Sequence, residues 1–139
     1  MTWIFWALLS AFFAAATAIF AKLGVAGVDS NLATAVRTSV VVLLAWAIAL
    51  ATRSPDGFHM PSKRTWLFLT LSGLATGFSW LCYFRALQLG PASRVAPIDK
   101  LSVALVIVFA ALFLGESITW GKVLGGLLIV AGAIVVALD

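Results

Sequence analysis

The residues of this chain that could do chemistry are mostly cations and hydroxyl groups set within long apolar stretches. Lys22, Arg37 and Lys100 each lie in or at the end of such a stretch. A charge inside a membrane-spanning segment costs about 2.5 to 3.5 kcal/mol on insertion scales, so an embedded cation calls for a physical reason. With the polar groups near them, these cations predict a water-accessible site for an anionic or zwitterionic small molecule. The candidate substrate-binding residues are Lys22, Arg37, Ser72, Thr76, Asp99 and Lys100.

A structural interpretation of the same cations is simpler. Long Lys and Arg side chains extend to a nearby membrane interface, and a carboxylate such as Asp99 pairs with one of them, so that the set anchors the helices. A stripe of alanines leads to Lys22, which is typical of a face that packs against another helix. We therefore expect Lys22 to point into the protein. The sequence leaves both interpretations open.

Other chemistries lack the residues that they need. His59 is the one histidine and Cys82 the one cysteine, so the chain has no cluster with metal-ligand spacing and no possible intrachain disulfide. No nucleophile, base and orienting group can be assembled, and no phosphate-binding loop occurs. The 9 basic residues are scattered without a continuous basic face, which argues against nucleic acid. We expect no enzyme activity, no metal, no cofactor and no nucleic acid partner.

The elements that carry the candidate residues are membrane spans. Of the 139 residues, 63% are hydrophobic and 10% charged. About 20 apolar residues make one helical crossing of a hydrocarbon core about 30 Å thick. The predicted spans are Trp3 to Lys22, Asn31 to Ala51, Thr65 to Gln88, Ser93 to Leu114 and Thr119 to Leu138. The sequence predicts an all-α integral membrane protein with five transmembrane helices in a compact bundle, surrounded by the lipid bilayer.

Two local signals concern the ends of these helices. Asp29 or Ser30 can cap the second span, because their side chains accept hydrogen bonds from free backbone N–H groups. Pro97 either distorts the fourth span just past its first turn or is the first residue of that helix. The second interpretation is favoured, because a proline at the first helical position breaks no hydrogen bond.

Positive charge is nearly balanced between the two sides of the membrane. An odd number of spans places the termini on opposite sides, and one side carries Arg53, Lys63, Arg64 and Lys122. The other side carries Lys22 and Arg94, and the embedded cations Arg37, Arg85 and Lys100 lie nearer that end. Trp80 and Tyr83 mark the interface of this second side, whereas the other tryptophans lie near the first. Because the orientation signal is weak, we expect dual topology.

Glycines provide faces for close helix packing. Gly121, Gly125 and Gly132 are spaced by four and seven residues and make one smooth face on the last span. We predict that this face is a dimer interface. Glu116, just before that span, is most simply a charge near a helix N-terminus, where the helix dipole favours it. A role in proton coupling is the alternative.

Several short motifs resemble the EamA domain of the drug/metabolite transporter superfamily. They are Phe84-Arg85-Ala86-Leu87, Gly90-Pro91-Ala92, Val95-Ala96-Pro97, Leu112-Phe113-Leu114-Gly115-Glu116 and the segment from Gly125 to Gly132. The resemblance implies a single EamA-like transmembrane domain over residues 1–139, equivalent to half of a ten-helix transporter. Where many members carry a proline soon after the Asp99 position, this chain has Leu101-Ser102-Val103. It also lacks the carboxylate that the small multidrug resistance branch carries in the middle of its first helix.

Together, the spans and the resemblance predict a secondary transporter, an exporter of small polar metabolites. It would be a multi-pass protein of the plasma (inner) membrane. Two copies, packed antiparallel, would reproduce the inverted repeats of a ten-span transporter, with an alternating-access pathway between the two five-helix units. Two alternatives stay open, a flippase for a lipid-linked polar head group and a non-transporting scaffold or subunit that needs a different partner chain.

Overall fold

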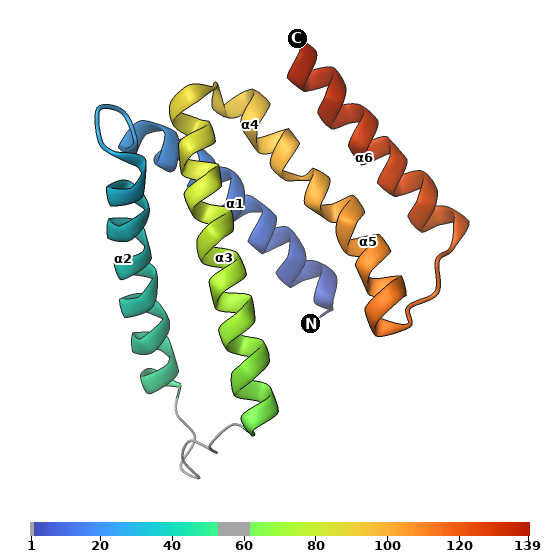
Figure 1. Cartoon of the computed structure of the whole chain (residues 1–139), viewed down its shortest axis with the longest axis horizontal. Helices are drawn as coiled ribbons and strands as arrows, with labels where there is room; N and C mark the ends of the chain where they lie inside the picture. The colour runs from blue at the N-terminus through green and yellow to red at the C-terminus, as the bar shows by residue number, and fades with distance from the viewer. Residues whose placement is uncertain (1, 53–61) are drawn as a thin grey trace. The chain divides into compact units, whose positions relative to one another are not determined.

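The computed structural model describes residues 2–52 and 62–139, and the described residues form six α-helices and no strand (Figure 1). The helices are α1 Trp3–Gly24, α2 Ser30–Ala51, α3 Lys63–Leu89, α4 Ala92–Asp99, α5 Leu101–Leu114 and α6 Trp120–Leu138. Taken together, α4 and α5 make one span, so the described helices give five segments long and apolar enough to cross a membrane. The all-α class and the five predicted spans are confirmed. Arg53 and His59, used in the sequence analysis, and Pro55 lie outside the described residues.

Polar side chains and a glycine set the helix boundaries. The Asp29 carboxylate accepts hydrogen bonds from the backbone N–H groups of Asn31 and Leu32, at 2.9 and 3.0 Å, and so caps α2 as predicted. At the end of α5, Gly115 has a φ of 68° and donates its N–H to the Ala110 carbonyl. This left-handed conformation strains any residue with a Cβ, so Gly115 allows the sharp stop.

The helix of the fourth span is interrupted at Lys100, between α4 and α5. Helix α4 begins at Ala92, and Pro97 lies inside it, so the favoured prediction of a helix beginning at Pro97 is wrong. The ring of Pro97 removes one backbone donor from the helix, and the regular pattern gives way three residues later. Around the break, Lys100 donates its N–H to the Pro97 carbonyl and accepts from the Val103 N–H, each at 3.0 Å. The polar pair Asp99 and Lys100 therefore lies at a discontinuity within the span.

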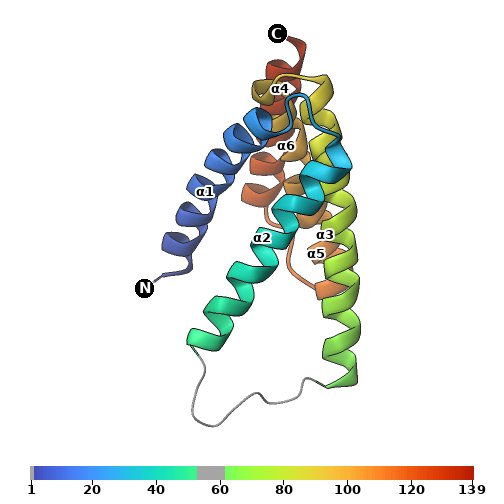
Figure 2. The same cartoon turned by 90° about the vertical axis from the view of Figure 1, so that its left-hand side faces the viewer.

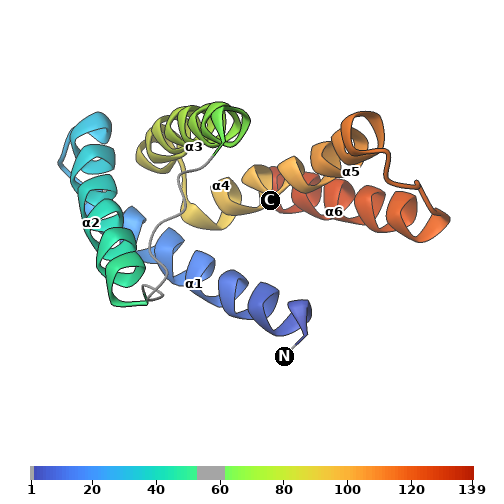
Figure 3. The ribbon, with the colours of Figure 1, turned by 90° about the horizontal axis from the view of Figure 1, so that it is seen from below.

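One compact unit comprises the residues up to Lys22 and Leu89–Asp139. In this unit both α4 and α5 pack along α6, as Figure 3 shows from below. On α6 the buried residues are Gly126 and Ala133, and on α5 the buried residue is Ala110. A Cβ placed on Gly126 would lie 3.4 Å from Cδ1 of Ile107. Small residues thus bring the helix backbones close together, which is the usual basis of packing in lipid.

The second compact unit, Leu23–Gln88, contains α2 and nearly all of α3. The buried residues of α2 are Ser30 and Thr34, at its beginning, and those of α3 are Phe84 and Leu87, at its end. Figure 2 shows the two helices close together at these ends and separated at their other ends. The closely packed part of this unit is therefore the part that contains the embedded Arg37.

Large apolar side chains cover the outside of the helices. Phe113 on α5 and Trp120 at the start of α6 are 78% and 88% exposed, and many Leu, Val and Phe side chains of α1 to α3 are exposed as well. Such a surface is stable only against lipid or another apolar surface. The multi-pass membrane location follows from it and from the five apolar spans.

Candidate functional site

The predicted site residues fall into the two units, and each group is described in its own unit. Lys22, Asp99 and Lys100 belong to the first unit. Arg37 belongs to the second unit, together with the hydroxyl residues Ser72 and Thr76.

Arg37 is held by aromatic rings. Its guanidinium carbon lies 4.2 Å from the ring centroid of Trp80 and 5.7 Å from that of Phe84, so a cation of α2 stacks on two rings of α3. Tyr83, on the same part of α3, is close enough to interact electrostatically with the guanidinium. A cation over the face of an indole gains about 0.5 to 2 kcal/mol, the larger value where water is excluded. The side chain is half-buried between the helices.

The face of α2 that carries Arg37 is polar. The Thr34 hydroxyl, which is buried, donates to the Ser30 carbonyl at 2.8 Å, and the Thr38 hydroxyl donates to the Thr34 carbonyl at 2.7 Å. These bonds satisfy the hydroxyl protons within the helix, as is common for threonine in apolar surroundings. The hydroxyl oxygens keep their capacity to accept, so Arg37 is the charged donor on a polar face.

Ser72 and Thr76 lie on α3, on the side of the helix that continues to Trp80. Both residues are exposed, and the Thr76 hydroxyl donates to the Ser72 carbonyl at 2.9 Å. Residues four apart lie one above the other on a helix, so the series Ser72, Thr76, Trp80 and Phe84 forms one stripe that leads to the guanidinium of Arg37. Ser72 and Thr76 thus share a face of α3 with the rings that hold Arg37, and no direct contact joins these two hydroxyls to the guanidinium within the described part of the chain.

Arg85, in the same unit, is occupied differently. It donates to the Gln88 amide oxygen at 3.0 Å, and the Gln88 amide nitrogen donates to the Val28 carbonyl in the loop before α2. This relay ties the end of α3 to that loop. Arg85 is exposed, and its contacts support the structural interpretation of this cation.

Lys22 secures the end of α1 within the first unit. Its ammonium group donates to the Gly90 carbonyl at 2.8 Å, in a partly buried hydrogen bond. Gly90 follows the last residue of α3, where backbone carbonyls lack helical partners. The predicted inward direction of this lysine agrees with that contact, which favours a structural role.

Asp99 and Lys100 meet at the break between α4 and α5. The Lys100 ammonium lies 3.1 Å from the Asp99 carboxylate, and the two side chains are 56% and 36% exposed. An ion pair this exposed contributes little to stability, at most about 1 kcal/mol. The pair joins two consecutive residues, so it does not tie α4 or α5 to another helix.

The turn between α5 and α6 explains the Leu-Gly-Glu motif physically. Gly115 ends α5, and the Glu116 carboxylate pairs with the Lys122 ammonium at 3.2 Å. Lys122 also donates to the Ser117 carbonyl at 3.0 Å, and the Thr119 hydroxyl accepts from the Lys122 backbone N–H at 3.3 Å, which caps α6. Glu116 is thus engaged by a lysine across the turn, which argues for a structural rather than a proton-coupling role.

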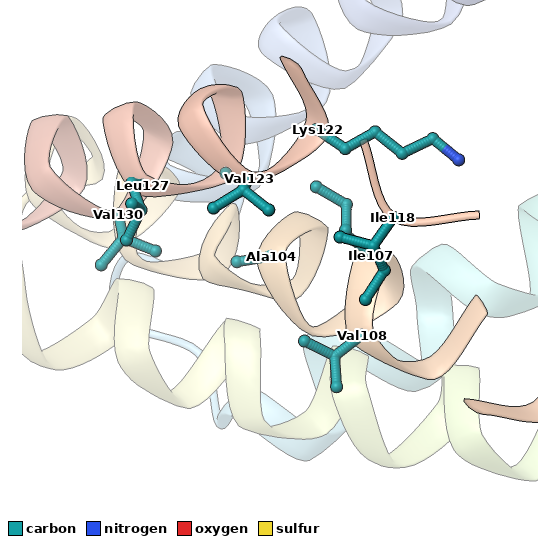
Figure 4. A pocket seen from close by; sticks show the side chains of 9 residues that line it. Ala104, Ile107, Val108, Ile118, Lys122, Val123, Leu127 and Val130 are labelled. Atoms are coloured by element: carbon teal, nitrogen blue, oxygen red, sulfur yellow. The ribbon is translucent and has the colours of Figure 1, made fainter. Parts of the chain in front are cut away.

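An apolar pocket of about 200 Å³ lies between α5 and α6 (Figure 4). Ala104, Ile107, Val123 and Val130 are among the residues that line it, and Figure 4 shows the Lys122 chain extending away with its ammonium outermost. Substrate sites combine apolar walls with convergent polar groups. This pocket lacks such groups, so it is a less suitable site than the surroundings of Arg37.

The glycines of α6 divide into one that packs inside the unit and three that do not. Gly126 meets Ile107, whereas a Cβ on Gly125 or Gly132 would meet no heavy atom within 4 Å. A Cβ on Gly121 would approach only Thr119 Oγ1, at 3.9 Å. Within its own unit, the face predicted as a dimer interface is therefore open.

Sequence reasoning missed the aromatic partners of Arg37. It placed Trp80 at the membrane interface and did not foresee that the half-buried indole lies under the Arg37 guanidinium. The available signal was the four-residue spacing from Thr76 to Trp80 and on to Phe84. Among residues 2–52 and 62–139, His, Cys, Asp and Glu form no group of three or more that could hold a metal ion.

Comparisons with known proteins extend over the whole chain. Residues 1–138 match the model of a family described as the EamA-like transporter family. A relative from Sinorhizobium sp, named "Uncharacterized transporter in cobO 3'region", is 55% identical over 139 residues, which cover 98% of this chain and 96% of the relative. No solved structure matches.

Proposed function

The chain belongs to the EamA-like transporter family, and from this membership we propose that it is a secondary transporter that exports small polar metabolites. The observation that carries the proposal is the family match over residues 1–138, which coincides with the five apolar spans. The family and the name of the relative point to a transporter and not to an enzyme. A single EamA-like domain over residues 1–139 in the plasma membrane is part of the proposal.

The proposed working form is a dimer in which two copies of the chain, each with five spans, enclose an alternating-access pathway. The open face of Gly121, Gly125 and Gly132 on α6 supports this, because glycine faces let two helices approach closely in lipid. The exposed apolar surface of the helices supports it as well, since part of that surface can be covered by a second copy.

The proposed pathway is lined by the predicted binding residues. Arg37 is its main recognition group, because its guanidinium is fixed by rings and still accessible. The other proposed contributors are Lys22, Ser72, Thr76, Asp99 and Lys100. Among them, Lys22 is already hydrogen-bonded to Gly90 and contributes mainly to the position of α1.

Flux through proteoliposomes tests transport. Purified protein would be reconstituted and loaded with amino acids, organic acids or quaternary amines, and release of each labelled compound down its gradient would be followed. We expect protein-dependent release of at least one class, with protein-free liposomes as the control. Release equal to that of protein-free liposomes for every class would contradict the proposal and favour a scaffold or subunit.

Orientation tests the antiparallel form of the dimer. The nearly balanced cations predict both orientations in one membrane, so single cysteines added near each terminus of a cysteine-free chain would label from both sides. Pro55 lies in the connection between the second and third predicted spans. Two lysines added beside it are expected to drive this connection to the cytoplasm in all molecules. A single orientation of the unmodified chain would contradict the antiparallel dimer and leave a parallel one.

A further inference from the structure

The cluster of Arg37, Trp80 and Phe84 carries an inference about the substrate. The backbone of Arg37 lies about 10 Å along the axis of α2 from Ser30, at 1.5 Å per residue, and so inside the predicted span. A long cation near a helix end would normally extend toward the interface. Here the side chain lies on the Trp80 ring of the neighbouring helix, at 4.2 Å.

The rings neutralise none of the charge of Arg37. Within the described part of the chain, the two ion pairs join Lys100 to Asp99 and Lys122 to Glu116, so no carboxylate of that part pairs with Arg37. Asp29, the acidic residue among the described residues of the same unit, uses its carboxylate to cap α2. The result is a cation with neutral aromatic rings on one helix and threonine hydroxyls on the other, which creates a positive potential that attracts anions.

The contact with the rings involves the charge of the guanidinium and needs none of its hydrogen-bond donors. Arginine has five N–H donors, all in the plane of the group. A planar fork held in this way matches the two oxygens of a carboxylate or phosphate, which accept two parallel hydrogen bonds. Because Trp80 already restricts the side chain, less conformational entropy is lost when the anion binds.

We propose that Arg37, oriented by Trp80 and Phe84, binds the carboxylate or phosphate group of a soluble organic anion, and that such anions are the substrate class. This inference rests on the proposed transport function, because it names the substrate of that same pathway. Arg37 is the binding residue, and Trp80 is a positioning residue that acts through it.

Binding can be measured without transport. The full chain would be placed in nanodiscs of zwitterionic phosphatidylcholine, and thermal unfolding would be followed with increasing succinate, glutamate or inorganic phosphate, and with tetraethylammonium as a cation of the opposite sign. We expect at least one anion, and not tetraethylammonium, to raise the midpoint of unfolding. Hydrogen bonds to charged groups contribute about 1.5 to 3 kcal/mol, so Arg37→Lys is expected to weaken the binding about tenfold and Arg37→Gln about a hundredfold.

Two further variants separate binding from folding. Arg85→Lys alters a cation of the same unit that is already bonded to Gln88, and it is expected to keep the response to the anion. Trp80→Phe keeps a ring beneath the guanidinium and is expected to keep most of the response, whereas Trp80→Leu is expected to lose it. Because Arg37→Lys keeps the charge and the side-chain length, it remains informative if Arg37→Gln does not fold.

The outcomes are distinct. Stabilisation that survives Arg37→Lys and Arg37→Gln unchanged, or no stabilisation by any of the three anions, would overturn the inference. A second set of nanodiscs containing anionic phosphatidylglycerol, without soluble anion, separates the two sources of phosphate. If only this lipid stabilises the protein through Arg37, the soluble substrate assignment is wrong. Flux of amines that does not depend on Arg37 would leave the transport function standing and overturn only the anion class.

Discussion

The helix pair α2 and α3 and the helices α4 to α6 differ in where they place their polar groups. In α2 and α3, the charged Arg37 lies at the contact between the helices, on the rings of Trp80 and Phe84. In α4 to α6, the contact is made by small and aliphatic residues, as where Gly126 meets Ile107. In this second region, Lys100 pairs with Asp99 at a break and Lys122 pairs with Glu116 at a turn.

This difference is informative because helices in lipid associate without a charge between them. Close packing of small residues suffices, and α4 to α6 follow that rule. An arginine between α2 and α3 adds an insertion cost that packing alone does not require. The comparison supports the proposals that α6 serves assembly and that the surroundings of Arg37 serve recognition.

The largest effect is expected at the open glycine face of α6. Replacing Gly125 with Leu fills the face, and the first atom of the new side chain has room inside the unit, since nothing lies within 4 Å of a Cβ there. We expect the dimer to become monomeric while helix content is retained, as measured by native mass spectrometry and circular dichroism. The matched control is Ala131→Leu, which adds similar bulk to an exposed position about 100° around the helix from Gly132. An unchanged oligomer in Gly125→Leu would place the contact elsewhere.

The next largest effect is expected at Lys22, whose ammonium group donates to the Gly90 carbonyl. Replacing Lys22 with Met leaves the partly buried Gly90 carbonyl without its donor, and a lost partner of this kind costs about 1 to 3 kcal/mol. We expect that decrease in the free energy of unfolding in a detergent titration followed by tryptophan fluorescence. Lys100→Met, which breaks only an exposed pair, is expected to change it by less than about 1 kcal/mol. Equal losses in the two variants would remove the distinction between these lysines.

A smaller effect is expected at the end of α5. Gly115 has a left-handed φ of 68°, which costs about 1 to 2 kcal/mol for a residue with a Cβ. Gly115→Ala should therefore lower the free energy of unfolding by about that amount in the same titration. Gly24→Ala is the control, because Gly24 has no positive φ and no neighbour within 4 Å of its Cβ position. A neutral Gly115→Ala would show that the turn relaxes.

The smallest effect is expected for Glu116→Gln, which breaks the exposed pair with Lys122. Exposed pairs contribute about 0.2 to 1 kcal/mol, so stability should fall by no more than that. The pH profile of transport in the variant should match that of the unmodified chain, because Glu116 is assigned a structural role. A large loss of proton dependence without loss of stability would restore the proton-coupling alternative.

Much of the fold was predictable because it depends on local composition. The length of apolar stretches predicts the five spans, and the types of Asp29 and Gly115 predict where α2 begins and α5 ends. The break at Asp99 and Lys100 was not predicted, because one proline is compatible with either a helix start or a distortion. Local sequence does not decide between them. Helix α4 also packs against α6, which lies far away along the chain.

The candidate site was less predictable, since it depends on how two helices are rotated against each other. The charge of Arg37 marked it as unusual, but its partner Trp80 equally suits a membrane interface. Similarly, Gly125 and Gly126 are adjacent in sequence, and only the rotation of α6 about its axis decides that Gly126 faces Ile107. Which face of a helix contacts its neighbour therefore cannot be read from one helix alone.

The most direct test of anion recognition by Arg37 is a measurement of transport currents on solid-supported membranes. Proteoliposomes of the unmodified chain, Arg37→Lys and Arg85→Lys would be exposed to the same panel of organic anions and amines. Anion-evoked currents in the unmodified chain and in Arg85→Lys, with currents in Arg37→Lys that need about tenfold more anion, are the predicted result. Currents evoked by amines alone, or anion currents of equal size in all three proteins, would contradict it.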